Sequence, residues 1–379
     1  MNTKLNEEQT MLKDMANHFA EHEIIPVARE LEHNHDFPKE LIKKMAELGI
    51  MGMSVPQEYG GIKTDTLSMA LVIEEISRAL PALAVVFSVH SSLFCYSINE
   101  FGTHEQKKKY LPLAAQAKIL GAFSLSEPEA GSDATALKTT CEKKGDGYLI
   151  NGIKSWVTNG QNADAFILFA KPKGKSNKNK MNAFIVEKNF PGLEISKIED
   201  KMGLHSSLTT EITLDNCPVP SSTLLGEEGQ GAQIAFRCLD YSRIGIAAQS
   251  VGLARRCLEE AVKYSHQRQA FGKNISSFQA IQFKIADMAT HLDAARLLTY
   301  RAADYSDKNQ PFSKESAMAK LFASETANKT AYEALQIHGG YGYSKEFYIE
   351  QLYRDARVLS LYEGTSEIQR IIISRHLLK

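Results

Sequence analysis

The spacing of apolar residues divides the chain into three zones. In the first, residues 1–120, apolar side chains recur at helical intervals, as Met11, Met15 and Phe19 do. We therefore expect an N-terminal helical domain. Its helices should begin or end at the prolines of this zone, which are Pro26, Pro38, Pro56, Pro81 and Pro112.

In the second zone, residues 121–230, the period falls to two and β-branched and aromatic residues become frequent, which is typical of strands. Turn signals such as Asn159-Gly160 and Pro191-Gly192 separate these runs. The expected domain is a small antiparallel β-barrel or sandwich. The lysine-rich stretch 171–180 should lie in a connection between two strands, as a solvated loop. The predicted strands include residues 148–150, 165–169, 182–186 and 210–214.

The third zone, residues 231–379, returns to helical spacing. One long amphipathic run contains Ile244 and Val251, another contains Ile285 and Met288, and an alanine-rich stretch covers residues 317–337. Long helices of this kind often pack as an antiparallel bundle, commonly within an oligomer. The order helical, β, helical predicts an α+β protein of three domains.

Composition narrows the class of protein. The formal net charge is -1, which gives no electrostatic reason to expect nucleic acid or an anionic membrane as a partner. No apolar run approaches the roughly 20 residues of a membrane-spanning helix. Residues 1–13 carry both charges without an apolar core, so no secretory signal is expected. The 5 widely spaced cysteines fit reduced, buried thiols, no metal-ligand set is recognisable, and we expect a cytoplasmic protein.

Two segments of the middle zone carry candidate chemistry, although each also has an ordinary structural explanation. Residues 123–133 place hydroxyls beside Pro128 and Gly131, which suits close approach to a ligand but also a tight polar turn. Residues 154–159 hold the only tryptophan, Trp156. Its ring would suit stacking on a planar heterocycle, whereas burial in the core explains an isolated tryptophan better.

Three further segments lie in the last zone. The guanidinium of Arg268 matches phosphate geometry, although a solvated arginine at a helix end is the simpler interpretation. Residues 336–343 carry three glycines in four positions, which expose backbone donors or merely cap a helix. Glu363 stands beside Gly364, ahead of residues that could simply start the last helix. No Walker A sequence, dinucleotide-binding fingerprint or hydrolase elbow is recognisable.

Taken together and in this order, the five segments resemble the acyl-CoA dehydrogenase family over essentially the whole chain, and are most similar to its short-chain, butyryl-CoA type. The resemblance implies an N-terminal helical domain, a middle β domain and a C-terminal four-helix domain, in a homotetramer with one FAD per subunit. The motifs that carry it are Ser126-Glu127-Pro128 with Ala130-Gly131-Ser132-Asp133, the cluster around Arg268, and Tyr362-Glu363-Gly364-Thr365-Ser366.

The resemblance also implies roles for individual residues. Glu363 would be the catalytic base. In relatives, the residues around Arg268 and 336–340 typically reach the cofactor across a subunit interface. Acyl-CoA would contact Ser132, Asp240, Tyr241, Ser242, Arg243 and Gly364. FAD would be bound by Phe123, Leu125, Ser126, Gly131, Ser132, Trp156, Val157, Thr158, Arg268, Phe271, Gln279, Gln336, Ile337, His338, Gly339, Gly340, Thr365, Ser366 and Glu367.

The implied reaction is α,β-dehydrogenation of a short-chain or short branched-chain acyl-CoA to a trans-2-enoyl-CoA. An α-proton beside a thioester is too weakly acidic for a free carboxylate, so the developing enolate needs hydrogen bonds at its oxygen. In the family these come from a flavin ribityl hydroxyl and the backbone N–H of the catalytic glutamate. A dry pocket should raise the pKa of Glu363 and make it a stronger base. Hydride would pass to the flavin, and electrons onward to an electron-transfer flavoprotein.

Three positions refine this expectation. Glu129 stands where relatives often carry a small or neutral residue, and its carboxylate could face the flavin or solvent. Ser242 occupies the position from which isovaleryl-type members take their base, which leaves Glu363 as the base. Ala84 replaces an arginine of glutaryl-type members, which argues against a dicarboxylate substrate. The alternatives are an oxygen-using, oxidase-like relative and a non-catalytic acyl-CoA-binding helical scaffold.

Overall fold

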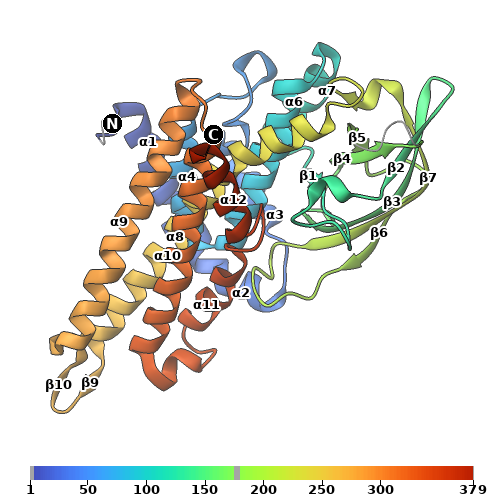
Figure 1. The fold of residues 1–379 in the computed structure, drawn as a ribbon. Helices are drawn as coiled ribbons and strands as arrows, with labels where there is room; N and C mark the ends of the chain where they lie inside the picture. The colour runs from blue at the N-terminus through green and yellow to red at the C-terminus, as the bar shows by residue number, and fades with distance from the viewer. Residues whose placement is uncertain (1–3, 175–179, 379) are drawn as a thin grey trace.

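The chain folds into helices, then a sheet, then helices again, in the predicted order (Figure 1). The structure is a computed structural model that describes residues 4–174 and 180–378. The central part of the lysine-rich stretch, 175–179, lies outside the described residues, so the loop predicted there stays a prediction. Its flanks fit the predicted connection, because one strand ends at Pro172 and the next begins at Asn182.

The N-terminal helices follow the predicted apolar spacing. Four of the five prolines stand at the start of a helical element, as predicted, but Pro112 does not. Pro26 lies within a continuous helical segment and follows the π-helical turn η1, where the backbone bonding already departs from that of an α-helix. Pro112 lies inside α7, near its C-terminal end. The elements are α1 (Glu7–Phe19), η1 (Ala20–Ile24), α2 (Ile25–Asn34), α3 (Lys39–Glu47), η2 (Ile50–Gly52), η3 (Gln57–Tyr59), α4 (Thr66–Ala79), α5 (Pro81–Ser88), η4 (Val89–Cys95), α6 (Tyr96–Phe101) and α7 (His104–Ala115).

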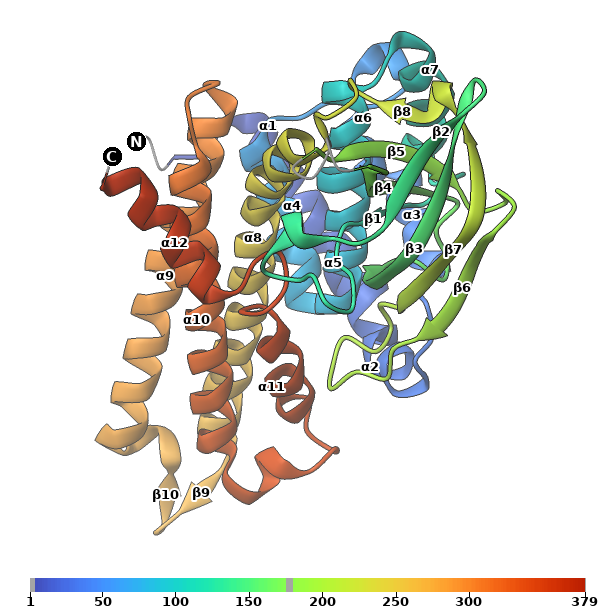
Figure 2. The same cartoon turned by 45° about the vertical axis from the view of Figure 1, so that its right-hand side comes forward.

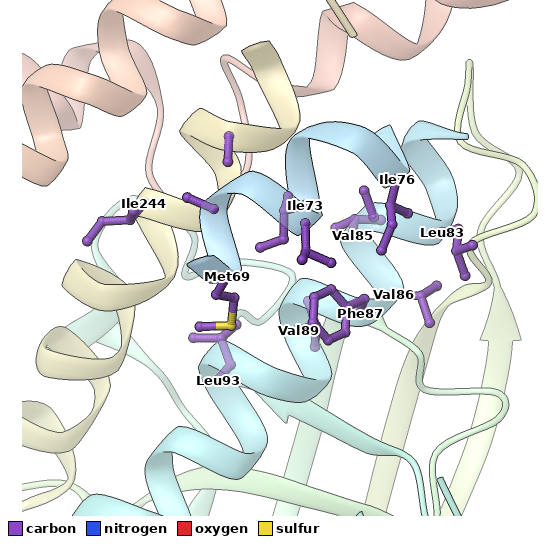
Figure 3. Close-up of a cluster of buried hydrophobic side chains, with 14 of the residues drawn as sticks. Met69, Ile73, Ile76, Leu83, Val85, Val86, Phe87, Val89, Leu93 and Ile244 are labelled. Atoms are coloured by element: carbon purple, nitrogen blue, oxygen red, sulfur yellow. The ribbon is translucent and has the colours of Figure 1, made fainter. Parts of the chain in front are cut away.

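The segment formed by α5, η4 and α6 corrects one expectation from the sequence. Residues Pro81–Phe101 form a helix that is long and apolar enough to cross a membrane by length and composition. Its side chains, however, are almost entirely buried inside the protein. Figure 3 shows Val85, Phe87, Val89 and Leu93 packed against side chains of α4 and the long C-terminal helix. The segment is therefore the central helix of the core, and its inner face reaches the site described below.

The middle domain is one curved sheet of eight strands among the described residues, in the order β6-β7-β3-β2-β4-β5-β8, with β1 paired to β4. Most neighbours are antiparallel, as predicted, but β1 and β2 run parallel to β4. In β4, Ile167 and Phe169 join the helical core while Leu168 faces a separate core inside the sheet. The strands are β1 (Gly121–Ser124), β2 (Thr140–Lys144), β3 (Gly147–Thr158), β4 (Ala165–Pro172), β5 (Asn182–Glu187), β6 (Leu193–Ile198), β7 (Thr209–Pro220) and β8 (Leu224–Leu225). The short helix η7 (Ser221–Thr223) connects β7 to β8.

The C-terminal domain is a helical bundle that also packs against α4. Gly252 permits this close approach, because a Cβ atom at that position would lie 2.2 Å from the carbonyl oxygen of Glu74. Figure 2 shows the loop between α11 and α12 lying beside the loop that follows β1. The elements are α8 (Gly231–Gln267), β9 (Gln269–Ala270), β10 (Lys273–Asn274), η8 (Ile275–Ser277), α9 (Gln279–Asp307), α10 (Ser313–His338), η9 (Gly339–Tyr343), α11 (Ile349–Val358) and α12 (Ser366–Leu377).

Candidate active site

A cavity of about 670 Å³ lies where the three domains meet, and this size is ordinary for a ligand site. Its walls come from the core helix, the loop after β1, the end of β3, the loop between β6 and β7, α8, and the segment before α12. The residues predicted for the site that line this cavity are Phe123, Leu125, Ser126, Gly131, Ser132, Trp156, Thr158, Arg243, Glu363, Gly364 and Thr365.

Glu363 reaches the cavity from an unusual stretch of backbone. Its φ is 51° and that of Gly364 is 91°, so two consecutive residues are left-handed. For a residue with a Cβ, this conformation costs roughly 1–3 kcal/mol and persists only where the surroundings hold it. The helix α12 starts directly afterwards, with Thr365 as its N-cap accepting a hydrogen bond from Ile368 N–H. A cap was the ordinary explanation of this motif, and the structure contains the cap as well as a glutamate that lines the cavity.

The surroundings of Glu363 raise its pKa to about 7. Burial is the main cause, because it penalises the carboxylate form. Three groups oppose this effect: the Ser242 hydroxyl, which donates to Oε2, the Arg243 guanidinium and the Lys320 ammonium. The carboxyl is thus poised to gain or lose a proton near neutral pH, which suits a general base.

Arg243 and Asp240 form a partly buried ion pair one helical turn apart on α8, with 2.5 Å between Nη1 and Oδ1. Arg243 lines the cavity, and its Nε donates to the carbonyl oxygen of Glu363 at 3.4 Å. Burial lowers the pKa of Arg243, and the Asp240 carboxylate opposes that effect. Tyr241 points elsewhere, with its ring stacked on Tyr96 at 4.1 Å between centroids.

The loop after β1 is held by a buried ion pair that composition alone does not reveal. Glu127 Oε1 lies 2.8 Å from Lys154 Nζ, and both side chains are almost fully buried. The same carboxylate accepts hydrogen bonds from the backbone N–H groups of Lys138 and Thr139, while Lys154 also donates to the carbonyl of Leu125 at 3.2 Å. Burial lowers the pKa of Lys154 to about 8, although Glu127 opposes that shift. This pair fixes the shape of the wall formed by Leu125 and Ser126.

Trp156 is not a core residue. Its side chain is 61% exposed, its φ is 60°, and the register between β3 and β7 shifts between Lys154 and Val157. This irregularity turns the indole toward the cavity and its opening, while Val157 stays buried in the sheet. Burial in the core, the simpler interpretation of an isolated tryptophan, is therefore wrong for this residue.

The loop between β6 and β7 forms a wall of the cavity that sequence reasoning missed. Two buried carboxylates anchor it: Glu32 of α2 accepts from the N–H groups of His205 and Ser206, and Asp355 of α11 accepts from Leu204 N–H at 2.7 Å. Its lining residues are Asp200, Lys201, Met202, Gly203, Leu204 and Ser207. The loss of period-two spacing after β6 signals a loop, but nothing local shows that it folds back over the cavity.

A second group of predicted residues lies away from this cavity, at the far end of the bundle (Figure 1). Arg268 sits at the base of the β9–β10 hairpin with its guanidinium over the ring of Tyr341, 5.6 Å from the centroid, and Phe271 at the hairpin tip is 95% exposed. Gln279 starts α9, and residues 336–340 end α10, where Gly339 is the C-cap. Within a single chain, these residues therefore do not line the cavity that contains Glu363.

The exposure and contacts of the remaining predicted residues show which way their side chains face. Ser366 is buried in the first turn of α12 and Glu367 is exposed beside it. Glu129, whose direction was open, is exposed and pairs with Lys138, so its charge faces solvent. Three buried residues that touch the Glu363 segment were not among the predicted site residues: Lys320, Gln369 and Gln249.

Comparison with known proteins agrees with this architecture over the full length. Acyl-CoA dehydrogenase family domains match in order: the N-terminal domain over residues 6–118, the middle domain over 122–217 and the C-terminal domain over 229–378. An acyl-CoA dehydrogenase of Bacillus subtilis is 50% identical over 374 residues, which cover 99% of each chain.

Two solved structures superpose closely. A chain from a structure of the electron transferring flavoprotein of Acidaminococcus fermentans gives a TM-score of 0.98 at 46% identity, and butyryl-CoA dehydrogenase of Megasphaera elsdenii gives 0.97 at 41% identity. Both cover 100% of each chain. The fold and site thus define a three-domain protein of the acyl-CoA dehydrogenase class. The chain belongs to the acyl-CoA dehydrogenase family.

Proposed function

We propose that this protein catalyses the FAD-dependent α,β-dehydrogenation of short-chain or short branched-chain acyl-CoA to trans-2-enoyl-CoA, with Glu363 as the base that removes the α-proton. The observation that carries the proposal is the carboxyl of Glu363, which opens on an apolar cavity with its pKa raised to about 7. The similarity to butyryl-CoA dehydrogenase supports a short acyl chain.

The residues of the cavity divide the task between them. Glu363 accepts the proton once its carboxyl is ionised, and Val85, Val89 and Leu93 provide an apolar wall that excludes water from the acyl chain. The backbone N–H of Glu363 is the donor that the family resemblance assigns to the thioester oxygen, where it would stabilise the enolate. The ion pair with Asp240 fixes the position of the Arg243 guanidinium on the α8 wall of the cavity.

The cavity fits the ring end of FAD. The indole of Trp156 offers a planar surface, Phe123 and Leu125 are apolar neighbours, and Ser126 and Thr158 carry hydroxyls able to address polar ring edges. When bound, FAD supplies the acceptor for the β-hydrogen as hydride. We propose that an electron-transfer flavoprotein then receives the electrons, in keeping with the similarity to the Acidaminococcus chain.

We further propose a cytoplasmic homotetramer in which the residues at the far end of the bundle bind the cofactor of a neighbouring subunit. These residues are Arg268, Phe271, Gln279 and 336–340. Two observations support this arrangement. These residues lie away from the cavity of the same chain, and Phe271 and Tyr343, two large aromatic side chains at that end, are exposed. Light scattering of the purified holoenzyme measures the stoichiometry directly. A monomer that retains FAD would contradict the arrangement.

Replacement of Arg268 with alanine is expected to weaken FAD binding roughly 10- to 100-fold, since a hydrogen bond to a charged group contributes about 1.5–3 kcal/mol. Flavin retained per subunit after gel filtration, and the Kd from flavin fluorescence, measure the effect. Lys273→Ala is the matched control, because Lys273 is an exposed cation on the same hairpin. Equal retention by the Arg268 and Lys273 variants would remove Arg268 from the cofactor site.

Replacement of Ser242 with alanine is expected to shift the pH dependence upward. The Ser242 hydroxyl is the largest of the influences that lower the pKa of Glu363, so its loss raises that pKa. Activity needs the ionised carboxylate and rises with pH through about 7 in the native enzyme. At pH 6 the variant should be about tenfold slower, given the ~1.5–3 kcal/mol of a charged hydrogen bond. Ser250→Ala should keep the native profile, because this buried serine of the same helix donates its hydrogen bond to the carbonyl oxygen of Ile246.

The proposed reaction is tested by incubating the holoenzyme with butyryl-CoA, isobutyryl-CoA, isovaleryl-CoA and octanoyl-CoA, in separate assays with electron-transfer flavoprotein and with oxygen alone. Mass spectrometry of the products should show loss of two hydrogens from the short esters when the flavoprotein acceptor is present. Turnover that needs oxygen and releases peroxide would support the oxidase-like alternative. Purified protein without flavin would support the non-catalytic scaffold.

A further inference from the structure

The backbone carbonyl oxygens of Glu363 and Gly364 accept hydrogen bonds from buried side chains of three different helices. Lys320 of α10 donates from Nζ to the carbonyl oxygen of Gly364 at 2.7 Å. Gln369 of α12 donates from Nε2 to the same oxygen at 2.8 Å and to that of Glu363 at 3.2 Å. Arg243 of α8 adds a longer contact to the Glu363 oxygen.

Lys320 and Gln369 are both fully buried, so these contacts are not shared with bulk solvent. A lysine without exposure is uncommon, because removing an ammonium from water carries a large desolvation penalty. Neither side chain lines the cavity. Their shared feature is the backbone that they hold, in which Glu363 and Gly364 are both left-handed.

We propose that Lys320 and Gln369 form a clamp that keeps the Glu363–Gly364 backbone left-handed and so aims the Glu363 carboxyl into the cavity. They are positioning residues, since neither reaches the cavity. The inference rests on the proposed role of Glu363 and adds two residues that were not among the predicted site residues.

Lys320 also acts on Glu363 through its charge. The ammonium favours the carboxylate form of Glu363, and burial lowers the pKa of Lys320 itself to about 8. The other charged groups that act on Lys320 are Arg243 from α8, Glu325 from its own helix and Glu367 from α12. Gln369 carries no charge, so the two members of the clamp can be separated experimentally.

The test compares Lys320→Met with Gln369→Leu, two variants of similar size that remove the donors. Both are expected to lower kcat roughly 10- to 100-fold, because a misplacement of about 1 Å at a reacting group costs of that order. Only Lys320→Met should also move the ionisation of Glu363 to higher pH, since only it removes a neighbouring cation. Lys329→Met, an exposed lysine on the same helix, is the control and should change neither quantity.

The ionisation of Glu363 is followed by infrared titration of the holoenzyme, with the carboxyl band assigned by its loss in Glu363→Gln. This readout does not need turnover, so it stands even if the proposed reaction is wrong. Native kcat in both variants, or an unshifted carboxyl titration in Lys320→Met, would overturn the clamp. If Lys320→Met does not fold, native kcat in Gln369→Leu still overturns it.

Discussion

Glu363→Gln should lower kcat by roughly 100- to 10,000-fold, the usual contribution of a positioned general base. An amide has nearly the same shape as a carboxylate but cannot accept the α-proton. Binding of flavin and of the CoA ester should persist, because Arg243 and the loop after β1 do not depend on the charge of Glu363 for their other contacts. Stopped-flow measurement of flavin reduction isolates the chemical step.

The same variant should be more stable than the native protein above neutral pH. In the folded protein the pKa of Glu363 is about 7, against about 4.5 for an ordinary glutamate, so ionisation disfavours folding. Stability is therefore lost as pH rises from about 4.5 to 7, and Glu363→Gln should recover about 1–3 kcal/mol at pH 8. Glu30→Gln, an exposed position on α2, should change neither rate nor stability. A Glu363 variant within a few-fold of the native rate would remove Glu363 as the base.

Lys154→Met should destabilise the protein by about 3–5 kcal/mol, because it leaves the Glu127 carboxylate buried without its cation. The double variant Glu127→Gln with Lys154→Met should lose less, since it removes both charges. Chemical denaturation monitored by circular dichroism measures each free energy of unfolding. The wall formed by Leu125 and Ser126 should loosen in the single variant and retain flavin less well.

An exposed ion pair provides the control. Lys173 and Glu142 are also 2.8 Å apart, but their side chains are 64% and 42% exposed. Lys173→Met should therefore cost less than about 1 kcal/mol, because solvent screens such a pair. Equal losses from Lys154→Met and Lys173→Met would mean that burial does not set the strength of the Glu127–Lys154 interaction.

The architecture followed from the sequence because it depends on periodicity, which is local. The four predicted strands lie within β3, β4, β5 and β7, and the change from helical to alternating spacing occurs near β1. Proline was a weaker guide. Pro26 stands in the first turn of α2, where proline is tolerated, but Pro112 lies inside α7, where the sequence predicted a boundary.

The site was only partly predictable, because several of its contacts join residues far apart in the chain. Lys154 meets Glu127 across 27 positions, Lys320 meets Gly364 across 44, and Asp355 meets Leu204 across 151. Each is an ordinary polar residue in its own segment. The exposed Trp156 likewise depends on a register shift between paired strands, which composition does not encode.

The central claim is best tested by anaerobic titration of the purified holoenzyme with butyryl-CoA, isovaleryl-CoA, octanoyl-CoA and palmitoyl-CoA, with flavin absorbance as the readout. The proposed function predicts strongest bleaching with a short straight or branched ester, and none in Glu363→Gln on the same timescale. A flavin-containing protein that no saturated acyl-CoA bleaches would leave the fold intact and contradict the assigned reaction.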